Sequence, residues 1–199
     1  MILAIDPSLT IYLARHGQTE FNCENRFCGD ADSPLTPRGI EEAHRNGRAL
    51  RAHVAKHAHL RLVSSPLQRA LDTAAIIRSE LGRAKLAIAT DARLREISFG
   101  AWEGLTLEEI KARDPAAWAR RVADRWHVPA PGGESYEAVA ARVGAWLSEQ
   151  SGVQLVVTHG AVDRILRGLY AGLTPEEMCK LPEPQDELFQ LKGSRITTL

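Results

Sequence analysis

The strongest constraint in this sequence is a regular alternation of short apolar runs with segments that favour helices. The apolar runs have the length of buried strands and cover residues 11–14, 60–64, 86–89 and 153–157. Helices are expected between and after them, over residues 36–56, 66–81, 135–149 and 161–170. Strands that alternate with helices predict an α/β fold, a three-layer α/β/α sandwich around a mostly parallel sheet.

The remaining segments contain turn-forming residues, and none of them has the character of a linker between domains. Residues 22–33 and 94–104 are expected to be loops, with short helices over 106–113 and 115–125. A terminal hairpin is expected from residues 188–191 and 195–198. We therefore expect one domain over residues 1–199, in which residues 101–133 form a lid or cap insertion.

Composition excludes several classes of protein. The 199 residues include 25 Lys plus Arg and 25 Asp plus Glu, so no basic excess points to a nucleic-acid or membrane partner. The three cysteines do not suggest a disulfide framework, and no apolar run approaches the length of a membrane span. Residues 1–10 contain Asp6 and Pro7 and lack the basic start of a secretory signal. We expect a cytoplasmic protein.

Residues of catalytic type follow the predicted strands. Arg15 and His16 follow the first strand, and His159 follows the strand at 153–157. Arg69 comes after the second strand, and Glu96 lies in the loop after the third. Because ligands bind beyond the carboxyl ends of strands in such sheets, we expect these five residues to converge on one rim.

This combination of residue types fits phosphoryl transfer. Guanidinium groups match phosphate oxygens, a neutral imidazole is a nucleophile toward phosphorus, and a carboxylic acid can protonate a leaving alkoxide. Each residue alone has an ordinary structural interpretation: a hydrogen-bonded strand-end histidine, a solvated loop carboxylate or a helix-surface arginine. Only their joint position at successive strand ends favours catalysis.

The sequence resembles the histidine phosphatase superfamily, the phosphoglycerate-mutase-like proteins. The resemblance rests on six segments in the family's order: RHGQTEFN from Arg15, NRFCGDADSPLTPRG from Asn25, SSPLQRALDTA from Ser64, LREISFGAWEGLT from Leu94, PGGESYEAVAARV from Pro131 and VVTHGAVDRIL from Val156. The residues of these motifs are most similar to those of the small-phosphatase branch, which includes ribazole-phosphate and broad-specificity phosphatases. The resemblance implies a mixed sheet with one antiparallel strand, adjacent histidine-bearing strands, and neither metal nor cofactor.

The resemblance also implies a role for each matched residue. His16 is the expected nucleophile, and Glu96 is the expected proton donor. The expected phosphate-binding groups are Arg15, Asn22, Arg69, His159 and the backbone amide of Gly160. One residue departs from the family pattern, and another competes with Glu96 for the role of proton donor. Gln18 stands where many members carry Glu, and Glu103 is a second carboxylate that could act as the acid.

The expected function is hydrolysis of a small phosphorylated metabolite through a phosphohistidine. The alternatives are a phosphoglycerate-mutase-type phosphotransferase, a phosphohistidine-protein phosphatase and an inactive binding module. Residues 103–131 are short beside the corresponding part of mutases, which favours the phosphatase. A cysteine phosphatase is excluded because no cysteine is followed by five residues and then Arg. The oligomeric state stays open.

The expected lid contains many aromatic and arginine side chains that could contact the leaving group of a substrate. They are Trp102, Trp118, Trp126, Tyr136, Arg113, Arg120, Arg121 and Arg125. The aromatic rings could pack on an apolar or nucleoside-like group or belong to the core of the small helices, which is the interpretation preferred for Trp118. The arginines could meet an acidic substrate or form a solvated helix face.

Overall fold

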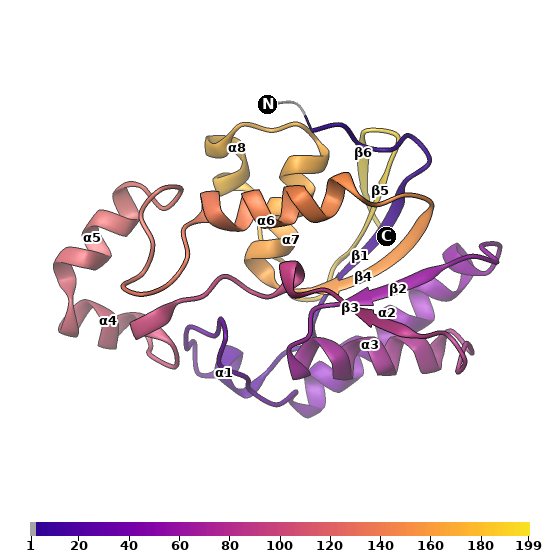
Figure 1. Ribbon diagram of the computed structural model, residues 1–199. Helices are drawn as coiled ribbons and strands as arrows, with labels where there is room; N and C mark the ends of the chain where they lie inside the picture. The colour runs from indigo at the N-terminus through magenta and orange to yellow at the C-terminus, as the bar shows by residue number, and fades with distance from the viewer. Residues whose placement is uncertain (1–2) are drawn as a thin grey trace.

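A six-stranded mixed sheet forms the centre of the molecule. The computed structural model describes residues 3–199. The strand order is β3–β2–β4–β1–β5–β6 (Figure 1). Their bounds are β1 Thr10–Arg15, β2 Arg61–Ser64, β3 Ile88–Thr90, β4 Val153–Thr158, β5 Leu188–Lys192 and β6 Arg195–Thr198. Strands β1 to β4 are parallel, and β5 is antiparallel to both of its neighbours. The mostly parallel mixed sheet and the terminal hairpin are confirmed.

Helices cover both faces of this sheet and complete the predicted sandwich. Figure 1 shows α2 (Pro37–Val54) and α3 (Gln68–Glu80) on one side, with α6 (Tyr136–Ser148) and α7 (Gly160–Tyr170) on the other. Successive side chains of a strand point to opposite faces. Accordingly, Ile11 and Leu13 of β1 belong to the core cluster with α6 and α7, whereas Tyr12 and Ala14 belong to the cluster with α2 and α3.

Local signals explain where the long helices begin and end. The Thr36 hydroxyl accepts a hydrogen bond from the Gly39 amide, and Pro37 occupies the first position of α2. Gly82 follows α3 with a φ of 66°, a left-handed conformation that favours glycine. Two short helices were not expected: α1 (Glu20–Cys23), which overlaps the segment predicted as a loop, and α8 (Pro175–Lys180).

The segment expected to be a lid has its own small core. After the 3₁₀ turns Ala92–Leu94 and Gly100–Trp102 come α4 (Leu107–Arg113) and α5 (Pro115–Ala123), which lie beside the sandwich in Figure 1. The buried members of this core are Trp102, Ile110, Ala117 and Ala130, with Trp118 packed against them. The core interpretation of Trp118 is therefore confirmed.

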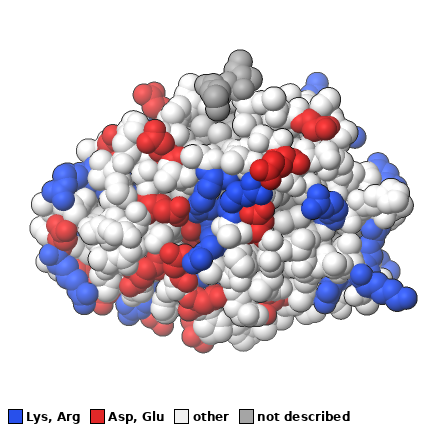
Figure 2. Space-filling view, viewed as in Figure 1, with Lys and Arg blue, Asp and Glu red and all other residues white. Residues whose placement is uncertain are grey.

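The molecular surface carries both signs of charge in close proximity. Figure 2 shows basic and acidic groups side by side across one face, without a broad area of a single sign. This mixture agrees with the balanced count of charged residues. Across residues 3–199, no helix combines the length and the apolar character that a membrane span requires.

Candidate active site

The two histidines predicted at strand ends lie next to each other. Strands β1 and β4 are parallel neighbours, with Arg15 opposite Thr158, so the residues that follow them leave the sheet side by side. The ring centroids of His16 and His159 are 5.1 Å apart. Both side chains are buried, at 4% and 0% exposure. The sheet thus brings together two residues separated by most of the chain.

His16 has a neutral imidazole with a defined tautomer. Its Nδ1 lies 2.8 Å from the carbonyl oxygen of Gly17, which can only accept, so Nδ1 carries the proton. Burial, followed by the positive charges of Arg15 and Arg69, lowers the pKa of His16 well below 6.5. The unprotonated Nε2 therefore retains a lone pair at neutral pH, as a nucleophile requires.

Ser65 indicates the tautomer of His159. The Ser65 Oγ accepts a hydrogen bond from the Leu67 amide at 3.3 Å, and within residues 3–199 the one acceptor for its own proton is His159 Nε2 at 2.7 Å, so Ser65 donates to Nε2. Burial is the main cause that lowers the pKa of His159 well below 6.5, and the positive charges of Arg69 and Arg15 act in the same direction, so the ring is neutral. With Nε2 accepting from Ser65, the ring proton of His159 sits on Nδ1.

The two arginines are held by the carbonyl oxygens of nearby loops. Arg69 is 1% exposed and donates to the carbonyls of Ala31 at 2.9 Å and Gly29 at 2.7 Å. It also pairs with Asp32 at 3.1 Å. Arg15 donates from Nη1 to the carbonyl of Glu183 at 2.9 Å. These contacts orient both guanidinium groups before any ligand binds.

Three buried nitrogen atoms beside His16 lack a hydrogen-bond partner within residues 3–199. They are Nε of Arg15, Nε of Arg69 and Nδ1 of His159. Each of them carries a proton, and a buried N–H without an acceptor is costly, by about 1–3 kcal/mol. Donors from two cations and a neutral imidazole match an anion with several oxygen atoms. The arrangement is suited to binding a phosphoryl group.

Glu96 is the carboxyl group of this site. It is 8% exposed and lines a cavity of about 280 Å³ together with Arg15 and His16. Its oxygens accept from the amides of Ile97 at 3.0 Å and Ala161 at 3.3 Å. Burial, followed by the nearby charge of Glu183, raises the pKa of Glu96, which favours the protonated acid.

Glu103, the competing carboxylate, has a different environment. It accepts hydrogen bonds from backbone amides only, those of Gly29, Asp30, Ala31 and Phe99. It is not among the residues that line the cavity at His16. These hydrogen bonds hold the loop of residues 29–31 against the loop that contains Phe99, so the role of Glu103 is structural.

Asn22 belongs to the wall of the same cavity, whereas Gly160 lies against two of its lining residues, Arg15 and Glu183. The Oδ1 of Asn22 accepts from the amide of Thr19 at 3.0 Å in the capping box of α1. Gly160 is the first residue of α7, so its backbone N–H lies at a helix N-terminus, which favours anions. A Cβ at Gly160 would lie 3.2 Å from the Arg15 guanidinium carbon, a tight contact that the guanidinium would have to shift to relieve.

Several residues of the site were not assigned from the sequence. Residues 181–187 form a strap that contributes Glu183 to the wall of the cavity, and its Gln185 side chain donates to the His16 carbonyl at 2.7 Å. Cys28 also lines the cavity, but burial raises the pKa of its thiol to about 11, so it is not a thiolate. The resemblance motif contains Cys28, whereas no sequence signal marks the strap.

Comparison with known proteins assigns the family. Residues 11–192 match the histidine phosphatase superfamily (branch 1). The chain belongs to the histidine phosphatase superfamily. Among curated histidine phosphatase relatives, a 2,3-bisphosphoglycerate-dependent phosphoglycerate mutase of Methylobacterium sp. (strain 4-46) is 37% identical over 177 residues, covering 83% of this chain and 82% of the relative.

Solved histidine phosphatase structures show the same architecture. The alpha-ribazole phosphatase of Shigella flexneri superposes with a TM-score of 0.80 at 25% identity, over 96% of this chain and 94% of that one. A mycobacterial glucosyl-3-phosphoglycerate phosphatase that complexes with VO3 gives 0.76 at 30% identity, over 96% of both chains. The relatives thus include both phosphatases and mutases.

No cluster suited to a metal ion accompanies the site. Across residues 3–199, no three His, Cys, Asp or Glu side chains gather where they could hold one. Arg15 and Arg26 are the cations that line the cavity at His16, and Arg69 lies close enough to lower the pKa of His16.

Proposed function

We propose that this chain hydrolyses phosphate monoesters of small metabolites, with His16 as the nucleophile. The observation that supports this most directly is the set of three unpartnered N–H groups, from Arg15, Arg69 and His159, beside the neutral ring of His16. A phosphoryl group would satisfy all three while its phosphorus atom faces Nε2. Preorganised donors of this kind stabilise charge that develops during transfer.

In the proposed first step, Nε2 of His16 attacks phosphorus and the bond from phosphorus to the leaving oxygen breaks. Glu96 gives its proton to that oxygen, so the alcohol leaves neutral. In the second step, Glu96 takes a proton from water, the hydroxide oxygen attacks phosphorus, and the N–P bond breaks. Orthophosphate leaves, and His16 and Glu96 return to their starting states.

The curated relatives favour a second candidate, a mutase that passes the phosphoryl group to another hydroxyl. Chain length does not separate the two candidates, because 177 aligned residues cover 82% of the Methylobacterium mutase. The shortness expected of residues 103–131 beside mutases is therefore not matched by a large difference in overall length from this relative. Hydrolysis is the preferred proposal because the two solved neighbours named above are phosphatases.

The deciding experiment follows the phosphoryl group. Brief incubation with p-nitrophenyl phosphate, followed by quenching, should leave acid-labile, base-stable phosphate on the wild-type chain. His16→Ala should abolish both this labelling and turnover, whereas the exposed His59→Ala should retain both. Full activity of His16→Ala would refute the nucleophile.

The mutase alternative has its own assay. The enzyme is incubated with 3-phosphoglycerate and a bisphosphoglycerate primer, and both the 2-isomer and free phosphate are measured. Rapid isomer interconversion with little phosphate would make the chain a mutase.

A further inference from the structure

Two further cavities continue outward from the cavity at His16. The middle cavity, of about 200 Å³, shares Phe27, Phe99 and Glu183 with the inner one. The outer cavity, of about 860 Å³, lies between residues 122–127 and 174–180, and it shares Val122 and Arg125 with the middle one. The shared lining residues make the middle cavity a neighbour of both the inner and the outer one.

The middle cavity holds more positive than negative charge. Three guanidinium groups line it, from Arg121, Arg125 and Arg164, but Glu183 is its one carboxylate. Glu183 is already paired with Arg164 at 3.1 Å. The excess of two positive charges is therefore not balanced by the wall of the cavity itself.

Arg121 is a buried cation without a carboxylate partner in the described part of the chain. It is 5% exposed, donates to the Val128 carbonyl at 2.8 Å, and lies 5.8 Å from the Phe99 ring centroid. Burial lowers the pKa of its guanidinium, and the nearby charge of Arg125 acts in the same direction. Removing a guanidinium from water is unfavourable unless a counter-charge compensates it, and an anionic ligand would supply one.

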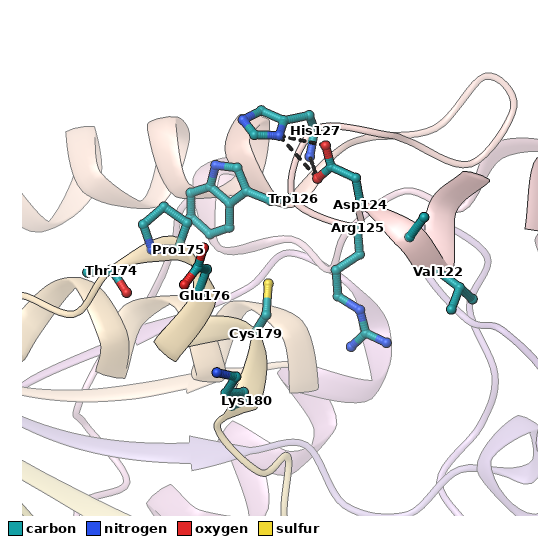
Figure 3. A pocket seen from close by; sticks show the side chains of 11 residues that line it. Val122, Asp124, Arg125, Trp126, His127, Thr174, Pro175, Glu176, Cys179 and Lys180 are labelled. Atoms are coloured by element: carbon teal, nitrogen blue, oxygen red, sulfur yellow. Dashed lines mark hydrogen bonds and ion pairs between the residues drawn. The ribbon is translucent and has the colours of Figure 1, made fainter. Parts of the chain in front are cut away.

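The outer cavity has two exposed cations at its wall, Arg125 and Lys180, beside the carboxylates of Asp124 and Glu176. Figure 3 shows Arg125, which comes from the loop after α5, to one side of Cys179 and Lys180, which belong to α8. Neither cation forms an ion pair within residues 3–199, whereas Asp124 is engaged by His127 at 2.9 Å. Glu176 is the second carboxylate of this wall, and the Trp126 ring adds an apolar surface.

We propose that the substrate is an elongated phosphate monoester whose leaving group runs through the middle cavity and ends in an anionic group at Arg125. This inference rests on the proposed hydrolase function and names its substrate class. The anionic group is a carboxylate or a second phosphate. The rings of Phe27 and Phe99 line the path of the connecting chain, and Lys180 adds positive charge at its outer end. A short ester would fill the inner cavity and leave Arg121 and Arg125 without counter-charge.

The test uses two series of substrates that differ only at the far end. Alkyl phosphates of increasing chain length carry either a terminal carboxylate or a terminal hydroxyl, and kcat/KM is measured for each pair. The carboxylate-to-hydroxyl ratio should stay near one for the shortest pair and rise to about tenfold once the chain reaches Arg125, as a charge-assisted hydrogen bond predicts. A third series with a terminal phosphonate distinguishes a carboxylate from a phosphate end.

Matched variants assign the effect to Arg125. Arg125→Gln should return the ratio to near one, and Lys180→Gln should lower it part of the way. Arg120→Gln removes an exposed arginine of α5 that lines none of the three cavities, so it should preserve the ratio of the wild type. A ratio that does not change with chain length, or that survives Arg125→Gln, overturns the inference.

A binding measurement separates this inference from the proposed function. Calorimetry with His16→Ala compares the long carboxylate ester with its hydroxyl counterpart, without turnover. Tighter binding of the carboxylate, lost on adding Arg125→Gln, supports the anionic subsite even if the chain proves to be a mutase. Equal binding of the two esters refutes the subsite, while hydrolysis of p-nitrophenyl phosphate by the wild type would leave the phosphatase proposal standing.

Discussion

Replacing Glu96 by Gln tests the proposed acid with little change in shape. The substitution removes the transferable proton but keeps an oxygen that can accept from the Ile97 amide, now at 3.0 Å. The amide nitrogen of the new side chain would then face the Ala161 N–H, where Glu96 now accepts at 3.3 Å. Two donors facing each other are unfavourable by about 1–3 kcal/mol, so the variant should fold with a slightly lower melting temperature.

The loss of activity should depend on the leaving group. An alkoxide needs a proton as it leaves, whereas p-nitrophenolate hardly does. A positioned general acid contributes about 10²–10⁴-fold, so Glu96→Gln should lower kcat/KM by that factor for an alkyl phosphate and by less than about tenfold for p-nitrophenyl phosphate. Phosphohistidine should accumulate in the variant if Glu96 also activates water, and a burst of nitrophenol would reveal it.

Glu103→Gln provides the matched control, because Glu103 contacts backbone amides of two loops and does not line the cavity. It should affect both substrates equally. Equal losses on both substrates for Glu96→Gln, or a larger leaving-group dependence for Glu103→Gln, would refute the assignment of the acid.

Three further predictions follow from the geometry. Because burial lowers the pKa of His16 well below 6.5, its protonation should abolish activity only at acid pH; kcat/KM for p-nitrophenyl phosphate should stay level through pH 6.5, and an acid limb centred at or above that value would contradict this. Ser65→Ala removes the donor to His159 Nε2 and should lower kcat/KM about tenfold. Ser65→Thr should retain the Nδ1–H tautomer, visible by ¹⁵N NMR, and an unchanged tautomer in Ser65→Ala would refute the role. Activity should survive a strong chelator, since Arg15, Arg69 and His159 supply the stabilising donors; inactivation reversed by a divalent metal ion would contradict this.

The sequence predicted the position of a site residue where that residue follows a strand. The apolar run before His159 and the shorter one before His16 predicted strands, and parallel pairing of β1 with β4 accounts for the proximity of the two rings. Glu96 could be placed on the same rim because the third strand also ends there. These predictions needed only the direction of the strands, which the alternation with helices supplies.

Side-chain contacts that depend on the course of a loop or on strand register could not be predicted from the sequence. The contact of Ser65 with His159 requires the register of β2 against β4, which no local pattern specifies. Glu183 reaches the cavity from an irregular segment without periodicity. The short helix α8 has a capping box between Thr174 and Glu177, which is a local sequence signal for the start of a helix.

The strap and β5 have a consequence for how the protein is made. Strand β5 pairs with β1, the strand that ends at Arg15, and the strap before it contacts Arg15 and His16. Both segments follow all the other elements of the cavity in chain order. During synthesis on the ribosome, earlier parts of the chain emerge and begin to fold first. Until β5 emerges, β1 keeps an unpaired edge, so the nascent chain completes its reactive centre after most of the sandwich has formed.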